Sequence, residues 1–356
     1  MSKNKETKII QIDSKDIDKE KIQTAARAIR KNKLVAFPTE TVYGLGANAL
    51  EEKAVKGIFE AKGRPADNPL IIHIARTESI NKIAHQFTEE AEKLSDEFWP
   101  GPMTLVLPKS DVVPGITTAN MDTVAIRMPS NRIARALIKE ADVPIAAPSA
   151  NISGRPSPTS AKHVLDDLSG RIDFVVDGGE TGYGVESTVI DLSEEIPTIL
   201  RPGPLPVKKL SKILGDIKVS SIAKAKEPED IGEAKSPGMK HEHYSPDSEV
   251  ILVEGNSDRV PSKIQELKRK NQEEGKKVGI LATEETAQNY ETGNVKVVGS
   301  RQSPEKIAKN LFKTLREFED IGIDIIFAEG LEEEGIGFAI MNRLRKASGY
   351  RILHVS

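Results

Sequence analysis

Two cations, Lys62 and Arg64, stand in the stretch KGRPADNPLIIHI, where two prolines restrict the backbone and a glycine permits a tight turn. Arginine presents a planar fork that matches phosphate or carboxylate, and lysine adds a movable point charge. The pair therefore suits a polyphosphate or carboxylate that must be held near reacting atoms. An isolated pair of this kind is more often a solvated basic turn. The anion site is an expectation that depends on matching groups elsewhere in the chain.

The segment PTETVYGLG offers a second polar set, with the hydroxyls of Thr39 and Thr41 and the phenol of Tyr43 beside Gly44. Glycine lets backbone amides approach a small ligand closely. Turns are rich in the same residue types, so this segment alone indicates no more than a glycine turn.

A third polar segment, APSANISGRPSPT, follows a predicted strand and carries Ser149, Asn151 and Ser157. Its hydroxyl and amide groups could wrap a triphosphate. A surface loop of serines and prolines is the alternative, but loops at the carboxyl ends of strands are where α/β sheets bind ligands.

Three short motifs add further candidates: Arg127 in VAIRMP, Ser187 in ESTVID and Arg201 in LRPG. Arg127 could equally be a salt-bridged residue at a sheet edge. Together with the basic stretch, these motifs would place four cations around hydroxyl donors.

The sequence lacks the motifs that several kinds of enzyme chemistry require. The sequence has no G-x-x-x-x-G-K-[ST] and no G-x-S-x-G, so neither a P-loop nor a serine elbow is expected. His241 and His243 could bind zinc together with His73 or His163, but an exposed histidine pair in a linker is commoner. We expect no resident metal and no covalent catalysis.

Composition sets the remaining limits. The chain has 356 residues, which exceeds the usual size of one core and favours two domains. Its formal charge of -3 balances 51 basic and 54 acidic side chains, so no global field draws it to nucleic acid or membrane. Cysteine is absent and the start, MSKNKETKIIQ, lacks the apolar run of a signal peptide. These features lead us to expect a cytoplasmic protein.

Hydrophobic periodicity predicts mixed α/β order over the first part of the chain. Helices are expected near 16–31, 53–61, 88–98 and 132–139. Strands are expected at 34–37, 70–74, 103–107, 124–128, 145–147, 173–177, 187–191 and 198–201. We expect them to form one sheet of about seven strands, with PTETVYGLG as a polar loop at a strand end.

A second α/β unit is predicted after a compositional shift. Residues 207–247 are rich in Lys, Glu, Ser, Pro and Gly and end in SPGMKHEHYSP, which suggests an interdomain connection. We expect strands at 250–253, 277–282, 295–298 and 323–328, and helices at 257–270, 304–318 and 340–346. The unit has no G-x-G-x-x-G, so nucleotide binding by it is not expected, and a regulatory or lid-supporting role is preferred. The predicted domains are therefore 1–210, a linker at 211–247, and 248–356.

The combination of PTETVYGLG, KGRPADNPLIIHI, S-x-N at Ser149 and Asn151, ESTVID and LRPG resembles the threonylcarbamoyl-AMP synthases of the YrdC-like family. The likeness covers about residues 20–210, while SPGMKHEHYSP and GFAIMNRLRKAS resemble the long, two-domain form. It implies a YrdC-like twisted mixed sheet as the catalytic domain and a smaller Rossmann-like α/β domain after it.

The resemblance also implies a reaction. L-threonine, bicarbonate and ATP would give L-threonylcarbamoyl-adenylate and pyrophosphate, with Mg²⁺ on the phosphates. A downstream transferase complex would then move the threonylcarbamoyl group to an adenosine beside the tRNA anticodon, and this chain need not hold tRNA itself.

By position in the matching motifs, the resemblance implies roles for thirteen residues. Those implied to contact threonine are Thr41, His73, Arg127 and Ser187. Those implied to contact ATP are Arg64, Asn68, Thr123, Ser149, Ser157, Arg201 and Tyr244. Lys62 and Asn151 are implied to line the reaction centre with Arg64, although the lysine could instead serve the geometry of its own loop. Tyr244, with His243, could close over the nucleotide and exclude water.

Two rival readings stay open at this point. The same cations could hold the backbone of double-stranded RNA or tRNA in a non-enzymatic module. The chain could also be a carbamoyl-transferring maturation protein, although that architecture would bring cysteine-rich zinc modules.

Overall fold

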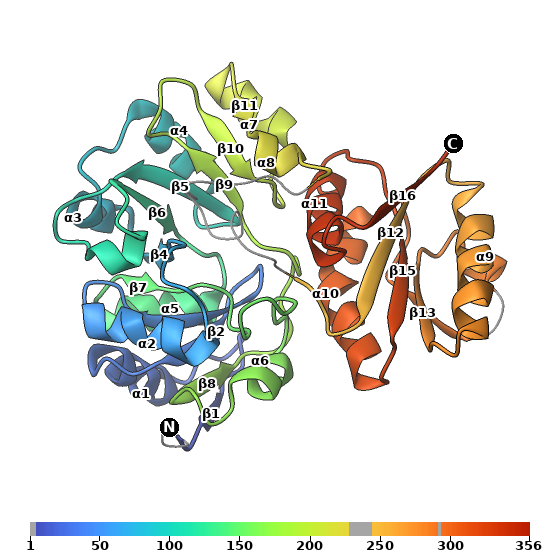
Figure 1. Cartoon of the computed structure of the whole chain (residues 1–356). Helices are drawn as coiled ribbons and strands as arrows, with labels where there is room; N and C mark the ends of the chain where they lie inside the picture. Colours follow the sequence, from blue (N-terminus) through green and yellow to red (C-terminus); the bar gives the residue numbers. More distant parts are fainter. Residues whose placement is uncertain (1–4, 228–243, 291–292) are drawn as a thin grey trace.

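The computed structural model describes residues 5–227, 244–290 and 293–356. Two α/β bodies lie side by side, the first in blue to yellow and the second in orange to red in Figure 1. This confirms the predicted architecture of a large mixed-sheet domain followed by a smaller, Rossmann-like one.

Within the described ranges, the first body is built on one sheet of eleven strands in the order β1-β8-β2-β3-β7-β4-β6-β5-β9-β10-β11. Parallel and antiparallel neighbours both occur, for example parallel β4 and β6 beside antiparallel β5 and β6. The strands are β1 Lys8–Gln11, β2 Val35–Pro38, β3 Tyr43–Asn48, β4 Ile71–His73, β5 Met103–Pro108, β6 Thr123–Arg127, β7 Ile145–Ala146, β8 Phe174–Asp177, β9 Thr188–Asp191, β10 Thr198–Arg201 and β11 Lys218–Val219.

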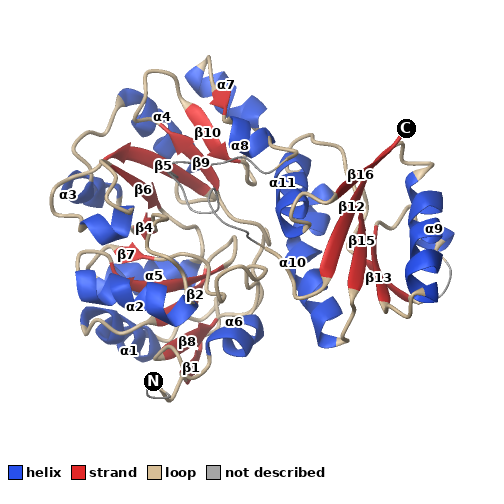
Figure 2. Cartoon of the chain, in the orientation of Figure 1, coloured by secondary structure: helices blue, strands red, loops and turns tan. Residues whose placement is uncertain are grey.

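Helices cover both faces of this sheet (Figure 2). They are α1 Lys19–Arg30, α2 Glu52–Lys62, α3 Ile80–Ile83, α4 Glu89–Phe98, α5 Arg132–Ala141, α6 Ala161–Leu168, α7 Val207–Leu214 and α8 Ser221–Lys224. Alternation along β2 divides its side chains between two cores, because successive residues of a strand face opposite sides. Val35 and Phe37 pack with α1 and α5, whereas Ala36 packs with α2 on the other face.

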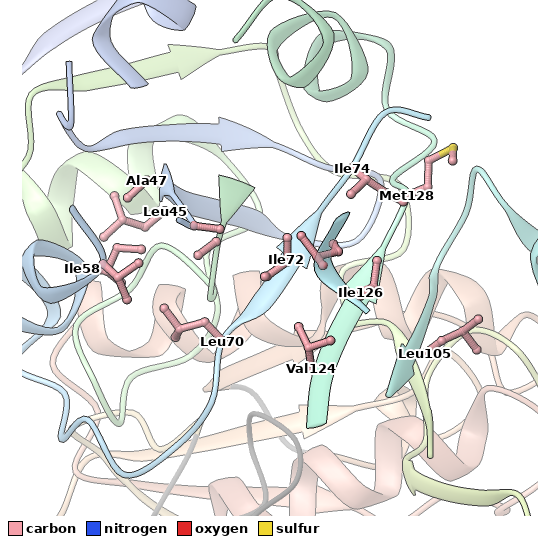
Figure 3. Packing of buried hydrophobic residues seen from close by; sticks show 14 of the residues in the cluster. Leu45, Ala47, Ile58, Leu70, Ile72, Ile74, Leu105, Val124, Ile126 and Met128 are labelled. Atoms are coloured by element: carbon pink, nitrogen blue, oxygen red, sulfur yellow. The ribbon is translucent and has the colours of Figure 1, made fainter. Parts of the chain in front are cut away.

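Figure 3 shows part of the second core, where Leu45 of β3, Ile58 of α2, Leu70, Ile72 of β4 and Ile126 of β6 come together. All five side chains are buried. Burial at roughly 1.5 to 3 kcal/mol for each such side chain makes this layer a rigid base for the loops that leave its strands.

The basic stretch begins on a helix rather than in a loop. Helix α2 includes Lys62 and ends at Gly63, which adopts the left-handed conformation with φ 60°. Glycine is the residue that takes this conformation at little cost, so it turns the chain sharply after the lysine. Lys62 consequently belongs to the end of a helix, whereas Arg64 belongs to the turn that follows it.

The prediction of about seven strands was too low because three strands carry weak signals. Half of PTETVYGLG is strand β3, which forms a hairpin with β2 and is buried along its whole length. Its glycines and polar neighbours are typical of a turn, but they allow close packing inside the sheet. Strands β1 and β11 are edge strands with exposed residues.

The second body has a five-stranded sheet in the order β14-β13-β15-β12-β16, with all strand pairs parallel. Helices α10 and α11 pack on one face and α9 on the other, as the two separate buried clusters show. Its elements are β12 Glu249–Gly255, α9 Val260–Glu273, β13 Val278–Ala282, β14 Asn294–Val297, α10 Pro304–Asp320, β15 Ile325–Glu329, α11 Gly337–Ala347 and β16 Ile352–Val355.

Ordered elements continue beyond residue 210. Strand β11 pairs with β10 of the first sheet, and α7 and α8 flank it. Most of SPGMKHEHYSP, including His241 and His243, lies outside the described residues. None of the helices in the described ranges is long and apolar enough to cross a membrane.

Helices α10 and α11 face the first body in Figure 1, and buried ion pairs cross the boundary between the two. Arg316 of α10 pairs with Asp167 at 2.7 Å, and Arg343 of α11 pairs with Glu186 at 2.9 Å. Gly184 of the first body, with φ 73°, lies so close to α10 that a Cβ there would meet its backbone oxygen atoms at 2.5 to 2.6 Å. The two bodies are therefore packed intimately.

Candidate active site

A polar pocket opens in the first body where several segments far apart in the sequence converge. The loop of the β2–β3 hairpin, the turn after α2, strands β4 and β6, the loop after β7 and the end of β10 all contribute. The residues that line it are Thr39, Thr41, Val42, Tyr43, Gly44, Arg64, Ile71, His73, Arg127, Ala147, Pro148, Ser149, Glu186, Arg201 and Tyr244.

One guanidinium of the pocket wall has an ion-pair partner but leaves some of its hydrogen bonds unmade. Arg127, the last residue of β6, lies with its Nη2 atom 2.8 Å from Oε1 of Glu40. The contact is an ion pair without hydrogen-bond geometry, because Nη2 and Nε of Arg127 and both carboxylate oxygens of Glu40 have no hydrogen-bond partner among the described residues. Since a buried guanidinium is normally hydrogen-bonded, Arg127 is ready to receive a carboxylate.

His73 and Thr41 supply uncharged groups to the same pocket wall. Burial, Arg127 and backbone hydrogen bonds together set the pKa of His73 to about 3, so its imidazole is neutral near pH 7. Its Nδ1 donates to the carbonyl oxygen of Ile71 at 3.2 Å, because a carbonyl can only accept. Thr39 donates to the carbonyl of Val42, so Thr41 must donate to Thr39 and keeps acceptor capacity of its own.

The pocket wall also holds Arg64 and Arg201. Burial lowers the pKa of each to about 10, and both stay cationic at neutral pH. Arg64 is partly exposed as a residue, but its Nε is buried and has no hydrogen-bond partner among the described atoms. Its Nη2 donates to the carbonyls of Asn68 and Pro69 at 3.3 and 3.5 Å, which are long distances. This guanidinium can therefore turn toward an anion at little cost.

Arg201 is held more firmly than Arg64. Its Nε donates to the carbonyl of Ser187 at 3.1 Å, and its Nη2 donates to the hydroxyl of Ser187 at 3.0 Å. That hydroxyl also meets Oγ1 of Thr104 at 2.8 Å. Ser187 thus fixes the direction of Arg201, and the fork remains at the pocket wall.

The loop after β7 is organised by two residues below the pocket wall. Nζ of Lys62 donates to the carbonyl oxygens of Ser149 and Asn151, and it is fully buried. The Asn151 amide donates to the carbonyls of Ile152 and Arg155 and accepts from the Ser149 hydroxyl. Burial lowers the pKa of Lys62 well below its usual value. In this arrangement Lys62 shapes the loop after β7, and not the loop of its own motif, as the alternative from the sequence suggested.

Tyr244 closes the pocket from the linker side. Its ring stacks on Phe312 of α10 with centroids 5.2 Å apart, and the guanidinium carbon of Arg343 lies 5.6 Å from its ring centre. Its φ of 69° is uncommon for a bulky residue and typical of positions where surrounding contacts fix the backbone. The second body therefore holds a residue of the pocket wall.

Comparison with known proteins covers both bodies of the chain. Residues 27–203 match a family model described as telomere recombination, and residues 205–349 match one described as threonylcarbamoyl-AMP synthase, C-terminal domain. The chain is 57% identical to the threonylcarbamoyl-AMP synthase of Pyrococcus abyssi, over 95% of this chain and 97% of that protein. It is 48% identical to the enzyme of the same name from Bacillus subtilis, over 93% and 94%.

The chain belongs to the threonylcarbamoyl-AMP synthase family.

A solved structure of P. abyssi Sua5 in complex with L-threonine has a TM-score of 0.93 and 56% identity to this chain, and covers 98% of this chain and 100% of that one. The family and the two-domain form inferred from the motifs are thereby confirmed. Some relatives in the threonylcarbamoyl-AMP synthase family match only the first body, such as one from Methanocaldococcus jannaschii described as putative, over 59% of this chain and 98% of that protein.

The structure divides the residues that the motifs suggested for a threonylcarbamoyl-AMP synthase. Those on the pocket wall are Thr41, Arg64, His73, Arg127, Ser149, Arg201 and Tyr244. Those outside the lining are Lys62, Asn68, Thr123, Asn151, Ser157 and Ser187. Three of the second group lie behind the wall: Ser187 supports Arg201, and Lys62 and Asn151 support the loop of Ser149. Both amide atoms of buried Asn68 have no partner within the described ranges, which leaves them open to a ligand.

Sequence reasoning missed two carboxylates of this site, Glu40 and Glu186. Both stand inside quoted motifs, PTETVYGLG and ESTVID. A glutamate between polar residues is typical of a solvated position, so only the arginines that reach them could have revealed their burial. Those partners, Arg127 and Arg343, lie far along the chain.

Proposed function

We infer that this chain condenses L-threonine, bicarbonate and ATP into L-threonylcarbamoyl-adenylate and pyrophosphate, the step that precedes threonylcarbamoyladenosine modification of tRNA beside the anticodon. One observation supports the proposal: a single pocket is lined by Arg127, whose guanidinium can bind a carboxylate, by uncharged Thr41 and His73, and by the cations Arg64 and Arg201. These groups suit an amino acid and a polyphosphate bound side by side.

Arg127 is proposed to bind the threonine carboxylate, with Glu40 as the carboxylate that it contacts when threonine is absent. Neutral His73 and the acceptor of Thr41 suit the hydroxyl and amine of threonine, because neither group would repel them. The amine must be uncharged to attack the carbon of bicarbonate, a step that forms the carbamate and releases water. A site crowded with cations favours loss of the proton of the amine.

The second step joins a carbamate oxygen to the α-phosphorus of ATP, and the bond to the bridging oxygen of pyrophosphate breaks. Negative charge grows on the phosphate oxygens during this displacement. Arg64 and Arg201 are placed to offset that charge, with the amide of Asn68 as an additional partner. The nucleophiles come from the substrates, so the protein contributes position and charge.

Mg²⁺ is proposed to arrive with the ATP phosphates rather than in a protein cage. Within the described part of the chain, no three histidine, cysteine or acidic side chains converge as a metal site. Magnesium commonly keeps water and phosphate oxygens as ligands and needs few from protein. The charge that the ion supplies would add to that of the two arginines.

A module that binds double-stranded RNA finds no support in the site. Arg127 and Arg201 are only 4% and 5% exposed, so a duplex backbone could not reach them. The decisive measurement is pyrophosphate release with threonine and bicarbonate each omitted in turn. We expect release to require both; equal ATP turnover without threonine would refute the proposed function. A downstream threonylcarbamoyl transferase is proposed to consume the adenylate.

Tyr244 is proposed to shield the adenylate from water. We expect Tyr244→Ala to release several-fold more free AMP per threonylcarbamoyl-adenylate formed, because the aromatic wall of the pocket is lost. Liquid chromatography of the nucleotide products measures the ratio. Tyr244→Phe keeps the ring that stacks on Phe312 and is the matched control. An unchanged product ratio in Tyr244→Ala would remove the shielding role.

A further inference from the structure

One carboxylate of the pocket wall, Glu186, is hydrogen-bonded to an arginine of the second body. Glu186 lines the pocket and lies just before β9. Its Oε1 accepts a hydrogen bond from the Ser157 hydroxyl, and its Oε2 accepts one from Nε of Arg343 at 2.9 Å. Arg343 belongs to α11, which faces the first body in Figure 1. A continuous chain of hydrogen bonds therefore runs from α11 through Glu186 to Ser157.

The side chain of Arg343, where this series of hydrogen bonds begins, is held firmly in place. Its side chain is fully buried, and its Nη1 donates to the carbonyl of Pro202 at 2.8 Å and to Oδ1 of Asn342 at 3.1 Å. The ring of Tyr244 lies beside its guanidinium. A buried carboxylate next to a hydrogen-bonded cation stays ionised, whereas one without that cation pays a large cost for its charge.

The charge state of Glu186 decides which hydrogen bonds it can make with a substrate. Burial raises the pKa of Glu186, but Arg343 and Arg201 outweigh burial and hold the pKa below its usual value. An ionised carboxylate can only accept, so the hydrogen of the Ser157 hydroxyl is committed to Glu186. Glu186, which lines the pocket, then presents only acceptors, and a substrate group that meets it must be a hydrogen-bond donor.

The nucleotide is the substrate on this side of the pocket. Arg201 and Tyr244 are electrostatic neighbours of Glu186, and Arg64 is in turn a neighbour of both. Glu40, by contrast, pairs with Arg127, which is proposed to bind the threonine carboxylate. The donors that a nucleotide carries are the hydroxyls of its ribose and the amino group of adenine.

The geometry points to Arg343 as a positioning residue of the nucleotide site, acting on Glu186 to keep this carboxylate of the pocket wall as an acceptor for a donor of the nucleoside. This inference rests on the proposed function, because it takes ATP as the substrate. The C-terminal domain then completes the nucleotide site from outside the pocket wall and without touching the nucleotide.

The test measures ATP and threonine affinity for the full-length wild type and for Arg343→Met by calorimetry at several pH values from 6 to 8. We expect Arg343→Met to weaken ATP binding about tenfold or more at pH 6 and to leave threonine binding within about twofold. The loss should shrink as the pH rises. Without Arg343, burial raises the pKa of Glu186, so the carboxylate is ionised at high pH and protonated as the pH falls.

Other groups titrate or carry charge around Glu186, and the design must separate them. They are Arg201 of β10, Tyr244, and Lys346 of α11, whose pKa burial, Arg343 and Arg201 lower to about 7. Arg343 lowers and Glu186 raises the pKa of Lys346, so replacing either residue also changes the titration of this lysine. Arg343→Met and Arg343→Met/Glu186→Gln are therefore compared in a Lys346→Met background, where the ATP affinity of the variant without Glu186 should lack the extra pH dependence of Arg343→Met.

Two controls distinguish positioning from loosened packing. Glu319→Gln removes a different ion pair between the bodies, with Arg155, and has no contact with Glu186. Arg343→Lys keeps the charge and should restore most of the pH independence. Arg343→Gln, which also lacks the charge, replaces Arg343→Met if the latter fails to fold. ATP, 2′-deoxy-ATP, 3′-deoxy-ATP and inosine triphosphate identify the donor, because the analogue lacking it should bind weakly and be insensitive to Arg343→Met.

Equal ATP affinity of the wild type and Arg343→Met at every pH would overturn the inference and leave the proposed function intact. An equal loss in Glu319→Gln, or a loss shared by threonine and independent of pH, would also overturn it. Wild-type protein that binds threonine but not ATP would refute the proposed function, and this inference with it.

Discussion

Replacing Arg64 by alanine should lower the threonine-dependent release of pyrophosphate by about 10²- to 10³-fold, the usual effect of removing a preorganised donor from a developing charge. Stability should change by no more than about 1 kcal/mol, because the two hydrogen bonds lost are long and end on carbonyls. Steady-state kinetics and urea unfolding measure the two effects. ATP affinity should fall with activity.

Arg64→Lys is the matched control for charge. Lysine keeps the positive charge but loses the planar fork, so we expect partial activity between those of the wild type and Arg64→Ala. If Arg64→Ala binds ATP as tightly as the wild type, the turn after Gly63 is a structural element only. The proposed binding of the ATP phosphates would then depend on Arg201 and Asn68 without Arg64.

Replacing Arg127 by methionine should have the second large effect, on two separate quantities. The KM for threonine should rise by about 100-fold or more, because the carboxylate loses a charge-assisted partner. Stability should fall by about 3 to 5 kcal/mol, because Glu40 becomes a buried carboxylate without its ion-pair partner. Threonine titration and urea unfolding measure the KM and the free energy of unfolding.

A double variant separates these two effects of Arg127. In Arg127→Met/Glu40→Gln the remaining side chains are uncharged, so most of the lost stability should return while threonine binding stays weak. Glu40→Gln alone should leave Arg127 free to bind threonine. A double variant that regains threonine affinity would show that Arg127 acts through packing and not by contact with the substrate.

The strands that carry the site could be predicted because their apolar runs are strong. Ile71 to His73 and Thr123 to Arg127 are largely buried, and their sequences show it. Strand β3 was missed because Tyr43–Asn48 contains two glycines and reads as a turn, although it lies inside the sheet. Its glycines are explained by close neighbours: a Cβ on Gly46 would meet Phe37 and Ile145 at 2.7 and 2.9 Å. Such contacts depend on tertiary packing, which local patterns do not record.

The cations of the site could be predicted from the sequence, but its carboxylates could not. Motif spacing pointed to Arg64, Arg127 and Arg201, all of which line the pocket. Glu186 has its partner 157 residues away in the other domain, so no local pattern could indicate its burial. Lys62 also looked like a ligand group because its carbonyl partners lie on a distant loop. Residues that act through distant partners are the ones that the sequence left ambiguous.

The contact at Gly184 has a consequence for variation among relatives. Its left-handed conformation disfavours most side chains, and its contact with the backbone of α10 excludes any side chain, yet the second restriction exists only where a second domain is present. Relatives that match the first body alone, such as the one from M. jannaschii, would have no helix there. We expect them to tolerate asparagine or aspartate at the equivalent position, since these residues adopt the left-handed conformation most readily after glycine. The presence or absence of the second domain would then decide which residue types are tolerated at this one position of the first domain.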